Sequence, residues 1–300
     1  SYEKKKWGIK LGLRIEQTDL STLLINTNEK NNQNFTNLFP SAHTSYKLND
    51  KVSFQIGYSS RVFRPRLWDL NPFFNISNNF NIKAGNPNLL PEYTDSYELG
   101  SIFVFDKMSF NVNIYDKYTT QVIEEVSIFE NGVNTHTPYN LGTRNTAGIE
   151  LNYKYSPNKV FSIHGDANYN LFVRKGTFEN QVFDFTADQW QSKLTGKYKV
   201  NKKLDIELSG NYQSRVKTIQ GIVSGNAFSN LGLRYKILKG KGVLNASVRD
   251  IFASRYREVV VDQEDFYLYS YGQRGRFITL GFSYGFGKGE AMQYSGGRRR

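Results

Sequence analysis

A two-residue alternation runs through most of this chain and limits what it can fold into. In residues 277–287, large and mostly apolar side chains occupy every second position, and small or polar ones lie between them. The same period recurs in residues 7–15, 51–59, 190–200 and 203–212. Because successive side chains of a strand point to opposite faces, each segment predicts a strand with one apolar and one polar face.

The connections between these segments also alternate in kind. Short polar turns are predicted at residues 48–51, 105–107, 156–159, 200–203 and 238–242. Longer loops are predicted at residues 18–38, 64–91, 127–138, 174–186, 216–226 and 254–273. We therefore expect about a dozen strands, joined in turn by a tight hairpin and a long loop, with no helix between them.

Two all-β architectures fit such a pattern: a soluble sandwich and a membrane barrel. Sandwich strands usually have ~5–6 residues, whereas membrane barrels need ~9–11 residues per strand and join them by short turns on one side. The alternating runs here have the longer length. Aromatic residues also stand where strands would meet the membrane interfaces, at Trp7, Tyr46, Tyr58, Trp190, Tyr198 and Tyr212.

The sequence therefore predicts an all-β, antiparallel, up-and-down transmembrane β-barrel. One face would contact outer-membrane lipids and the other would line a polar lumen. The residues predicted to point toward lipid are Trp7, Ile9, Leu11, Phe54, Ile56, Leu204, Ile206, Leu280 and Phe282.

The composition limits which classes of binding partner and metal site the chain can have. The net charge of +12 is spread along the chain, and only the final Gly-Gly-Arg-Arg-Arg is densely basic, so we expect no nucleic-acid partner. Cysteine is absent, which excludes disulfides and thiolate metal sites. We divide the chain into a barrel portion, residues 1–287, and a basic C-terminal tail, residues 288–300.

Residues 58–100 carry a resemblance to a known family. "YSSRVFRPRLWDLNPFF" (58–74) and "AGNPNLLPEYTDSYELG" (84–100) resemble the TonB-dependent receptors of the Gram-negative outer membrane and the outer-membrane β-barrel family related to them. The resemblance covers most of residues 1–287. In physical terms, Pro65 and Pro72 end a strand, and Gly85, Asn86 and Pro87 turn the chain back.

The resemblance implies a barrel of about 22 strands filled by a plug domain. Since only about twelve strands and no plug are visible, we expect the C-terminal part of a longer receptor. It would import a bulky solute (a siderophore, oligosaccharide or peptide), coupled to the TonB protein through a plug outside this sequence, without catalysis or a cofactor. The alternative is a non-transporting outer-membrane barrel that acts as a scaffold, or as a subunit of an envelope complex with surface lipoprotein partners.

The end of the last strand resembles the C-terminal assembly signal of outer-membrane barrels. The pattern is filled by Thr279, Gly281, Tyr284 and Phe286. The resemblance implies recognition by the barrel-assembly machinery.

The most ligand-like stretch is residues 66–83, in a predicted outer loop. It combines aromatic side chains with amides and a guanidinium, which suits sugars, peptides or flat chelates. The candidate ligand-binding residues are Arg66, Trp68, Phe73, Phe74 and Phe80. Alternatively, these aromatic residues pack the loop onto the barrel rim or onto a partner lipoprotein.

The histidines and paired carboxylates do not suggest catalysis or a metal site. His43 and His164 fall on polar strand faces and are expected to line the lumen, and His136 lies near a loop. The acidic clusters, Glu124–Glu125 and Asp262–Glu264–Asp265, are expected to be solvated.

Overall fold

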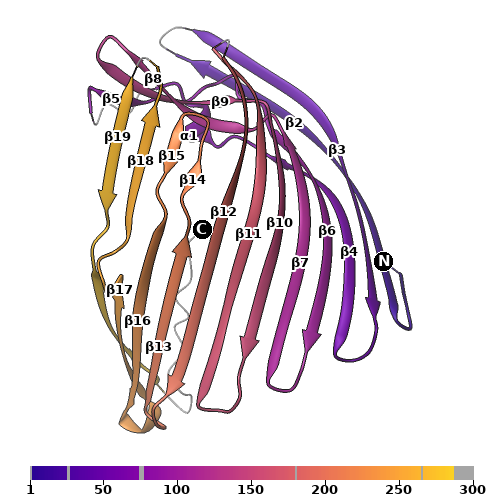
Figure 1. Ribbon diagram of the computed structural model, residues 1–300, viewed down its shortest axis with the longest axis vertical. Helices are drawn as coiled ribbons and strands as arrows, with labels where there is room; N and C mark the ends of the chain where they lie inside the picture. The colour runs from indigo at the N-terminus through magenta and orange to yellow at the C-terminus, as the bar shows by residue number, and fades with distance from the viewer. Residues whose placement is uncertain (1, 26–27, 74–77, 180, 265, 287–300) are drawn as a thin grey trace.

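A computed structural model of the chain describes residues 2–25, 28–73, 78–179, 181–264 and 266–286. Its main feature is one curved, antiparallel 13-stranded sheet whose strands follow one another in chain order (Figure 1). The strands of this sheet are β1 (Tyr2–Lys4), β2 (Trp7–Leu24), β3 (Glu29–Lys47), β4 (Val52–Phe63), β6 (Glu92–Val104), β7 (Met108–Thr120), β10 (Thr143–Tyr155), β11 (Phe161–Phe178), β12 (Gln181–Lys199), β13 (Leu204–Gln213), β16 (Asn226–Ile237), β17 (Gly242–Arg249) and β20 (Phe277–Tyr284). The predicted up-and-down arrangement is confirmed.

The pairing register joins the apolar faces of all the long strands into one surface. From Ile9, the residues directly opposite on successive strands are Thr44, Ile56, Leu99, Ile114, Ile149, Tyr169 and Trp190. All nine residues predicted to point toward lipid lie on this surface, because every register keeps the two-residue period in phase. We call it the membrane-facing wall. His43 and His164 lie on the opposite, polar face, as predicted.

Aromatic pairs mark two levels of this wall. Near the tight turns, the Trp7 and Tyr46 rings lie 4.7 Å apart. Toward the other end of the strands, the pairs are Tyr58–Tyr97, at 5.1 Å, and Tyr169–Trp190, at 4.3 Å. Side chains of this type are typical of the two interfaces of a membrane barrel, with the apolar band between them.

The five predicted tight turns are all present, and they lie along the lower rim in Figure 1. Three of them share one arrangement, in which an asparagine side chain accepts hydrogen bonds from two backbone N–H groups two and three residues later, where the next strand starts. Asn49 accepts from Lys51 and Val52, both at 2.9 Å. Asn158 and Asn201 repeat this arrangement. The local sequence is therefore sufficient to specify these turns.

The prediction of long loops is largely wrong, because most of these segments contain strands. Residues 18–38 and 174–186 belong mainly to the extended β2–β3 and β11–β12 hairpins. The other predicted loops contain β5 (Asn81–Lys83), β8 (Ile123–Glu130), β9 (Val133–Asn140), β14 (Val216–Lys217), β15 (Gly221–Val223), β18 (Tyr256–Asp262) and β19 (Tyr267–Gln273). These segments lie outside the apolar band, where both faces of many strands are polar and the alternation is hidden.

Two short helices also depart from the expectation of none: α1 (Leu67–Leu70) and the 3-10 turn η1 (Leu238–Gly240). No helix in the described ranges is long and apolar enough to cross a membrane. The main sheet is open, since β1 and β20 form its two edges and do not pair with each other in the part of the chain that the structure describes.

Candidate functional site

A β-hairpin at the end opposite the tight turns forms the most elaborate polar site. Residues 122–141, here called the strap, contain β8 and β9. The strap lies across the top of the sheet, toward the strands β14, β15, β18 and β19 (Figure 1). Its tip is an Asn131–Gly132 turn with φ of 52° and 79°, which is the type I′ geometry that this dipeptide favours.

The strap leaves and rejoins the wall at two residues with left-handed backbone conformations. These are Gln121, with φ of 56°, and Gly142, with φ of 60°. A Cβ atom at Gly142 would stand 1.9 Å from the Lys175 carbonyl oxygen. Only glycine fits this position, so the base of the strap is tightly seated against β11.

One of two opposed arginines, Arg174, anchors the strap to the polar face of the wall. Arg144 and Arg174 are directly opposite on β10 and β11, an arrangement that is unfavourable without counter-charges. Arg174 contacts the Glu124 carboxylate of the strap and donates to the Leu141 carbonyl, at 3.1 Å. Its side chain is only 4% exposed, so the ion pair joins wall and strap away from bulk water.

The loop that carries the receptor-like motif packs against the strap. β5 pairs in parallel with β9, and the Asn140 side chain binds both the N–H and the carbonyl of Leu90, at 2.7 and 2.8 Å. Leu89 is almost completely buried. A Cβ atom at Gly85 would lie 2.4 Å from the Asn71 carbonyl oxygen. The Gly-Asn-Pro segment therefore packs against the rest of the loop at the end of the sheet opposite the tight turns, which we call the mouth.

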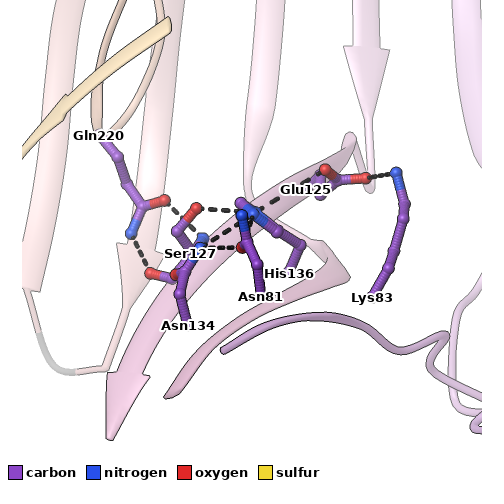
Figure 2. Close-up of polar contacts among 7 residues, drawn as sticks. All are labelled: Asn81, Lys83, Glu125, Ser127, Asn134, His136 and Gln220. Atoms are coloured by element: carbon purple, nitrogen blue, oxygen red, sulfur yellow. Dashed lines mark hydrogen bonds and ion pairs between the residues drawn. The ribbon is translucent and has the colours of Figure 1, made fainter. Parts of the chain in front are cut away.

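A second contact joins the strap to the segment between β14 and β15. Gln220, between β14 and β15, accepts a hydrogen bond from the Ser127 N–H, at 2.7 Å, and donates one to the Ser127 carbonyl, at 2.8 Å (Figure 2). Both residues are buried. The side-chain amide therefore pairs with the strap as a neighbouring strand would, across a sequence separation of 93 residues.

His136 is at the centre of the strap's polar network. Its Nδ1 lies 2.9 Å from the Ser127 hydroxyl, and its Nε2 lies 3.0 Å from the Asn81 side-chain oxygen (Figure 2). Burial lowers the pKa of His136 below its ordinary value of 6.5; the nearby Glu125 opposes this shift, and Lys83 adds to it. The imidazole is therefore mostly neutral at neutral pH and acts as a hydrogen-bonding hub.

The two predicted acidic clusters have different surroundings. Glu124 contacts Arg174, whereas Glu125 points to the other side of β8 and binds Lys83, at 2.5 Å. Glu124 is therefore part of the buried anchor, contrary to the prediction of a solvated acid. Of the second cluster, Asp262 and Glu264 are described and Asp265 lies outside the described residues. Within the described ranges, no group of three potential metal ligands occurs.

The predicted ligand loop presents its aromatic side chains to the surface. Trp68 is 83% exposed, Phe80 74% and Phe73 55%. Arg66 is also exposed, at the start of α1, and Phe74 lies outside the described residues. The structure does not pair these rings with one another or with another ring in the described part of the loop. Their role as a binding surface stays a prediction.

The predicted assembly signal spans both faces at the end of β20. Thr279 and Gly281 lie on the polar face, and Tyr284 lies on the membrane-facing wall. Phe286 follows the strand, is 88% exposed, and places its ring 4.9 Å from that of Tyr284. Recognition by the assembly machinery also stays a prediction.

Sequence reasoning missed the strap and its contacts. The Asn-Gly dipeptide at 131–132, flanked by alternating residues, was a signal for the hairpin. Gln220 and Arg174 gave no comparable signal, because their partners are distant in the sequence.

Comparison with known proteins extends these observations. The model of the outer membrane protein beta-barrel family matches residues 1–284. No curated protein matches the chain. Among solved structures, the siderophore receptor PiuA from Acinetobacter baumannii is 15% identical, with a TM-score of 0.63, over 92% of this chain and 40% of its own.

Two further structures are similar to a comparable degree. The FrpB iron transporter from Neisseria meningitidis is 16% identical, with a TM-score of 0.60, over 94% of this chain and 43% of its own. The copper transporter OprC is 13% identical, with a TM-score of 0.65, over 93% of this chain and 45% of its own. The chain thus spans less than half the length of these structures, and the likeness concerns the fold.

Proposed function

This chain belongs to the outer membrane protein beta-barrel family, and we propose that it forms the C-terminal wall of a TonB-dependent receptor that imports a bulky solute. The observation that carries the proposal is the constant separation of an apolar and a polar face through all twelve long strands, beneath a strap at one end. The apolar face suits the lipid of the outer membrane, and the polar face suits a hydrated lumen.

The open edges of the sheet support a larger barrel. Each backbone N–H or C=O left unpaired in hydrocarbon costs several kcal/mol. One edge is formed by β1 and, beyond its short pairing at Trp7–Ile9, by β2, and the other is formed by β20. Both edges therefore need further strands beside them. We propose that these strands complete a barrel of about 22 strands whose lumen holds a plug, through which the TonB protein couples energy to transport.

The exposed loop at the mouth supports direct contact with the solute. Arg66, Trp68, Phe73 and Phe80 place a guanidinium and aromatic rings at the surface; Phe74 is a candidate from the sequence alone. PiuA is a siderophore receptor, FrpB an iron transporter and OprC a copper transporter. Among siderophores, oligosaccharides and peptides, these similar structures favour a siderophore or another metal chelate.

Uptake in the native bacterium tests the proposal. Strains with and without the gene would be compared for accumulation of ⁵⁵Fe-labelled catecholate and hydroxamate chelates, labelled oligosaccharides and labelled peptides. We expect loss of one class on deletion, recovery with the wild-type gene, and no recovery when TonB is deleted. Unchanged uptake of every class, together with a lipoprotein that co-purifies in detergent, would favour the scaffold instead.

The binding surface has a matched test. Trp68→Ala combined with Phe80→Ala should weaken solute binding to whole cells, whereas Phe252→Ala should not. Phe252 is a matched control because it is also an exposed aromatic residue, at 71%, and lies outside the loop. Equal binding by all three proteins would remove the loop from the site.

Orientation and assembly are tested separately. A cysteine at Asn78, in the outer loop, should react with an impermeant maleimide on whole cells, and one at Asn201, in a tight turn, should not. If the end of β20 is an assembly signal, Phe286→Ala should lower the amount of folded protein more than Phe282→Ala. Equal amounts would leave only an ordinary strand.

A further inference from the structure

The membrane-facing wall has a groove that the transport proposal does not use. It has a volume of about 670 Å³ and follows a row of directly opposed residues from β2 to β10. That row consists of Leu11, Ala42, Tyr58, Tyr97, Asp116 and Ala147. The groove exists because the side chains of Ala42 and Ala147 are small, and Ile56, Leu99 and Ile114 line it.

The row climbs the wall from one side of the membrane toward the other. Leu11 lies near the tight-turn end of β2, whereas Asp116 and Ala147 lie in the far halves of β7 and β10. The groove is built entirely from contiguous strands of this chain, so its shape does not depend on the strands that complete the barrel.

The upper part of the groove has one carboxylate of the wall face, that of Asp116, and a second, that of Asp95, lies beside the groove at Tyr58. Asp95 accepts a hydrogen bond from the Tyr58 hydroxyl, at 2.9 Å. Asp116 is half-buried, and no side chain in the described part of the chain donates to it. Because Asp116 lies directly opposite Tyr97, its carboxylate is at the level of the interfacial Tyr58–Tyr97 pair, where the headgroup of a bound lipid can reach it.

Aromatic rings stand directly beside these carboxylates. The Tyr58 and Tyr97 rings form a tilted pair, and Tyr97 is directly opposite Asp116. An acid flanked by tyrosine faces is a favourable site for an ammonium group, which gains both a charge-assisted hydrogen bond and cation–π attraction. The same acids repel an anionic headgroup.

We propose that this groove binds a lipid with an ammonium headgroup. One acyl chain would lie along Leu11, Ile56 and Leu99, and the ammonium would bind between Asp116 and Tyr97. The inference requires only that the wall faces the membrane, so it stands or falls independently of solute import.

Native mass spectrometry of the protein purified from outer membranes provides the test. The purified protein would be mixed with palmitoyl-oleoyl phosphatidylethanolamine, phosphatidylglycerol or a neutral glucosyl diacylglycerol with the same acyl chains. We expect about threefold greater retention of phosphatidylethanolamine than of either other lipid. Equal retention of the three, preference for another lipid, or retention of detergent alone would overturn the proposal.

Three variants locate the site. Asp116→Asn should reduce retention of phosphatidylethanolamine to the level of phosphatidylglycerol. Ala147→Phe should fill the groove and reduce retention of all three lipids. Ala167→Phe, on the same wall but on β11 outside the groove, should bind as the unmodified protein does. Gel mobility before and after heating confirms that each variant is folded; a folded Asp116→Asn protein with unchanged preference would contradict the proposed headgroup site.

Discussion

The membrane-facing wall and the strap are held in place by different kinds of contact. The wall exposes large apolar side chains, such as Leu11 (73%) and Leu280 (78%), and relies on backbone ladders and on lipid. The strap has a fully buried residue, Val126, and relies on individual side chains, mainly Arg174 and Gln220. Lipid is a uniform partner that tolerates many apolar side chains, whereas each strap contact requires a particular residue.

The largest effect on the strap should follow from loss of its ion-pair anchor. Arg174→Ala leaves Glu124 without its buried partner, and breaking such a pair costs about 3–5 kcal/mol. We expect rapid hydrogen exchange over residues 122–141 while the wall stays protected. Lys175→Ala is the control, because its ion pair with Asp184 is exposed and should contribute about 0–1 kcal/mol. Equal exchange in the two variants would contradict the anchoring role.

The wall should respond to charge on one face only. Leu151→Lys places an ammonium toward lipid and should lower the free energy of unfolding by about 2–4 kcal/mol in bilayers. Asn152→Lys, on the polar face beside Glu150, should change it little. Denaturant unfolding in lipid vesicles measures both, and similar losses would contradict the assignment of faces.

These two regions also differ in how much the sequence predicts. The wall's strands, faces and tight turns follow from local patterns, since lipid on one side and water on the other impose the alternation from Trp7 to Tyr284. Beyond the membrane both faces of the sheet contact water, so β2, β3, β11 and β12 continue there without the alternation of apolar and polar residues. The contacts of Arg174 with Glu124 and of Gln220 with Ser127 depend on tertiary placement that no local pattern encodes.

A smaller effect is expected at the second contact of the strap. Gln220→Ala leaves the buried N–H and carbonyl of Ser127 unpaired, at a cost of about 1–3 kcal/mol. Exchange of the Ser127 amide should accelerate. Gln263→Ala, which removes a hydrogen bond to the Gln220 backbone but leaves the Gln220 side chain in place, should have a weaker effect. Unchanged Ser127 exchange in Gln220→Ala would show that the contact contributes little.

The smallest effect is a pH dependence confined to the strap. Because burial lowers the pKa of His136 below 6.5, the folded strap binds fewer protons than the unfolded strap over the interval between the two pKa values. Its contribution to stability is therefore present above pH 6.5 and is lost as the pH falls through the folded pKa. Hydrogen exchange of residues 122–141 between pH 8 and 5 measures this, after correction for intrinsic exchange rates. His136→Gln should flatten the profile, and a profile unchanged by this substitution would exclude His136 as its cause.

The two faces of the wall can be compared directly by spin labelling along β7. Single labels at residues 109–114 in lipid nanodiscs would be tested for collisions with oxygen, which concentrates in lipid, and with a water-soluble nickel chelate. The account predicts that Phe110, Val112 and Ile114 favour oxygen, whereas Ser109, Asn111 and Asn113 favour the chelate. Uniform accessibility along the strand, or the opposite alternation, would contradict a wall with lipid on one side and a hydrated lumen on the other.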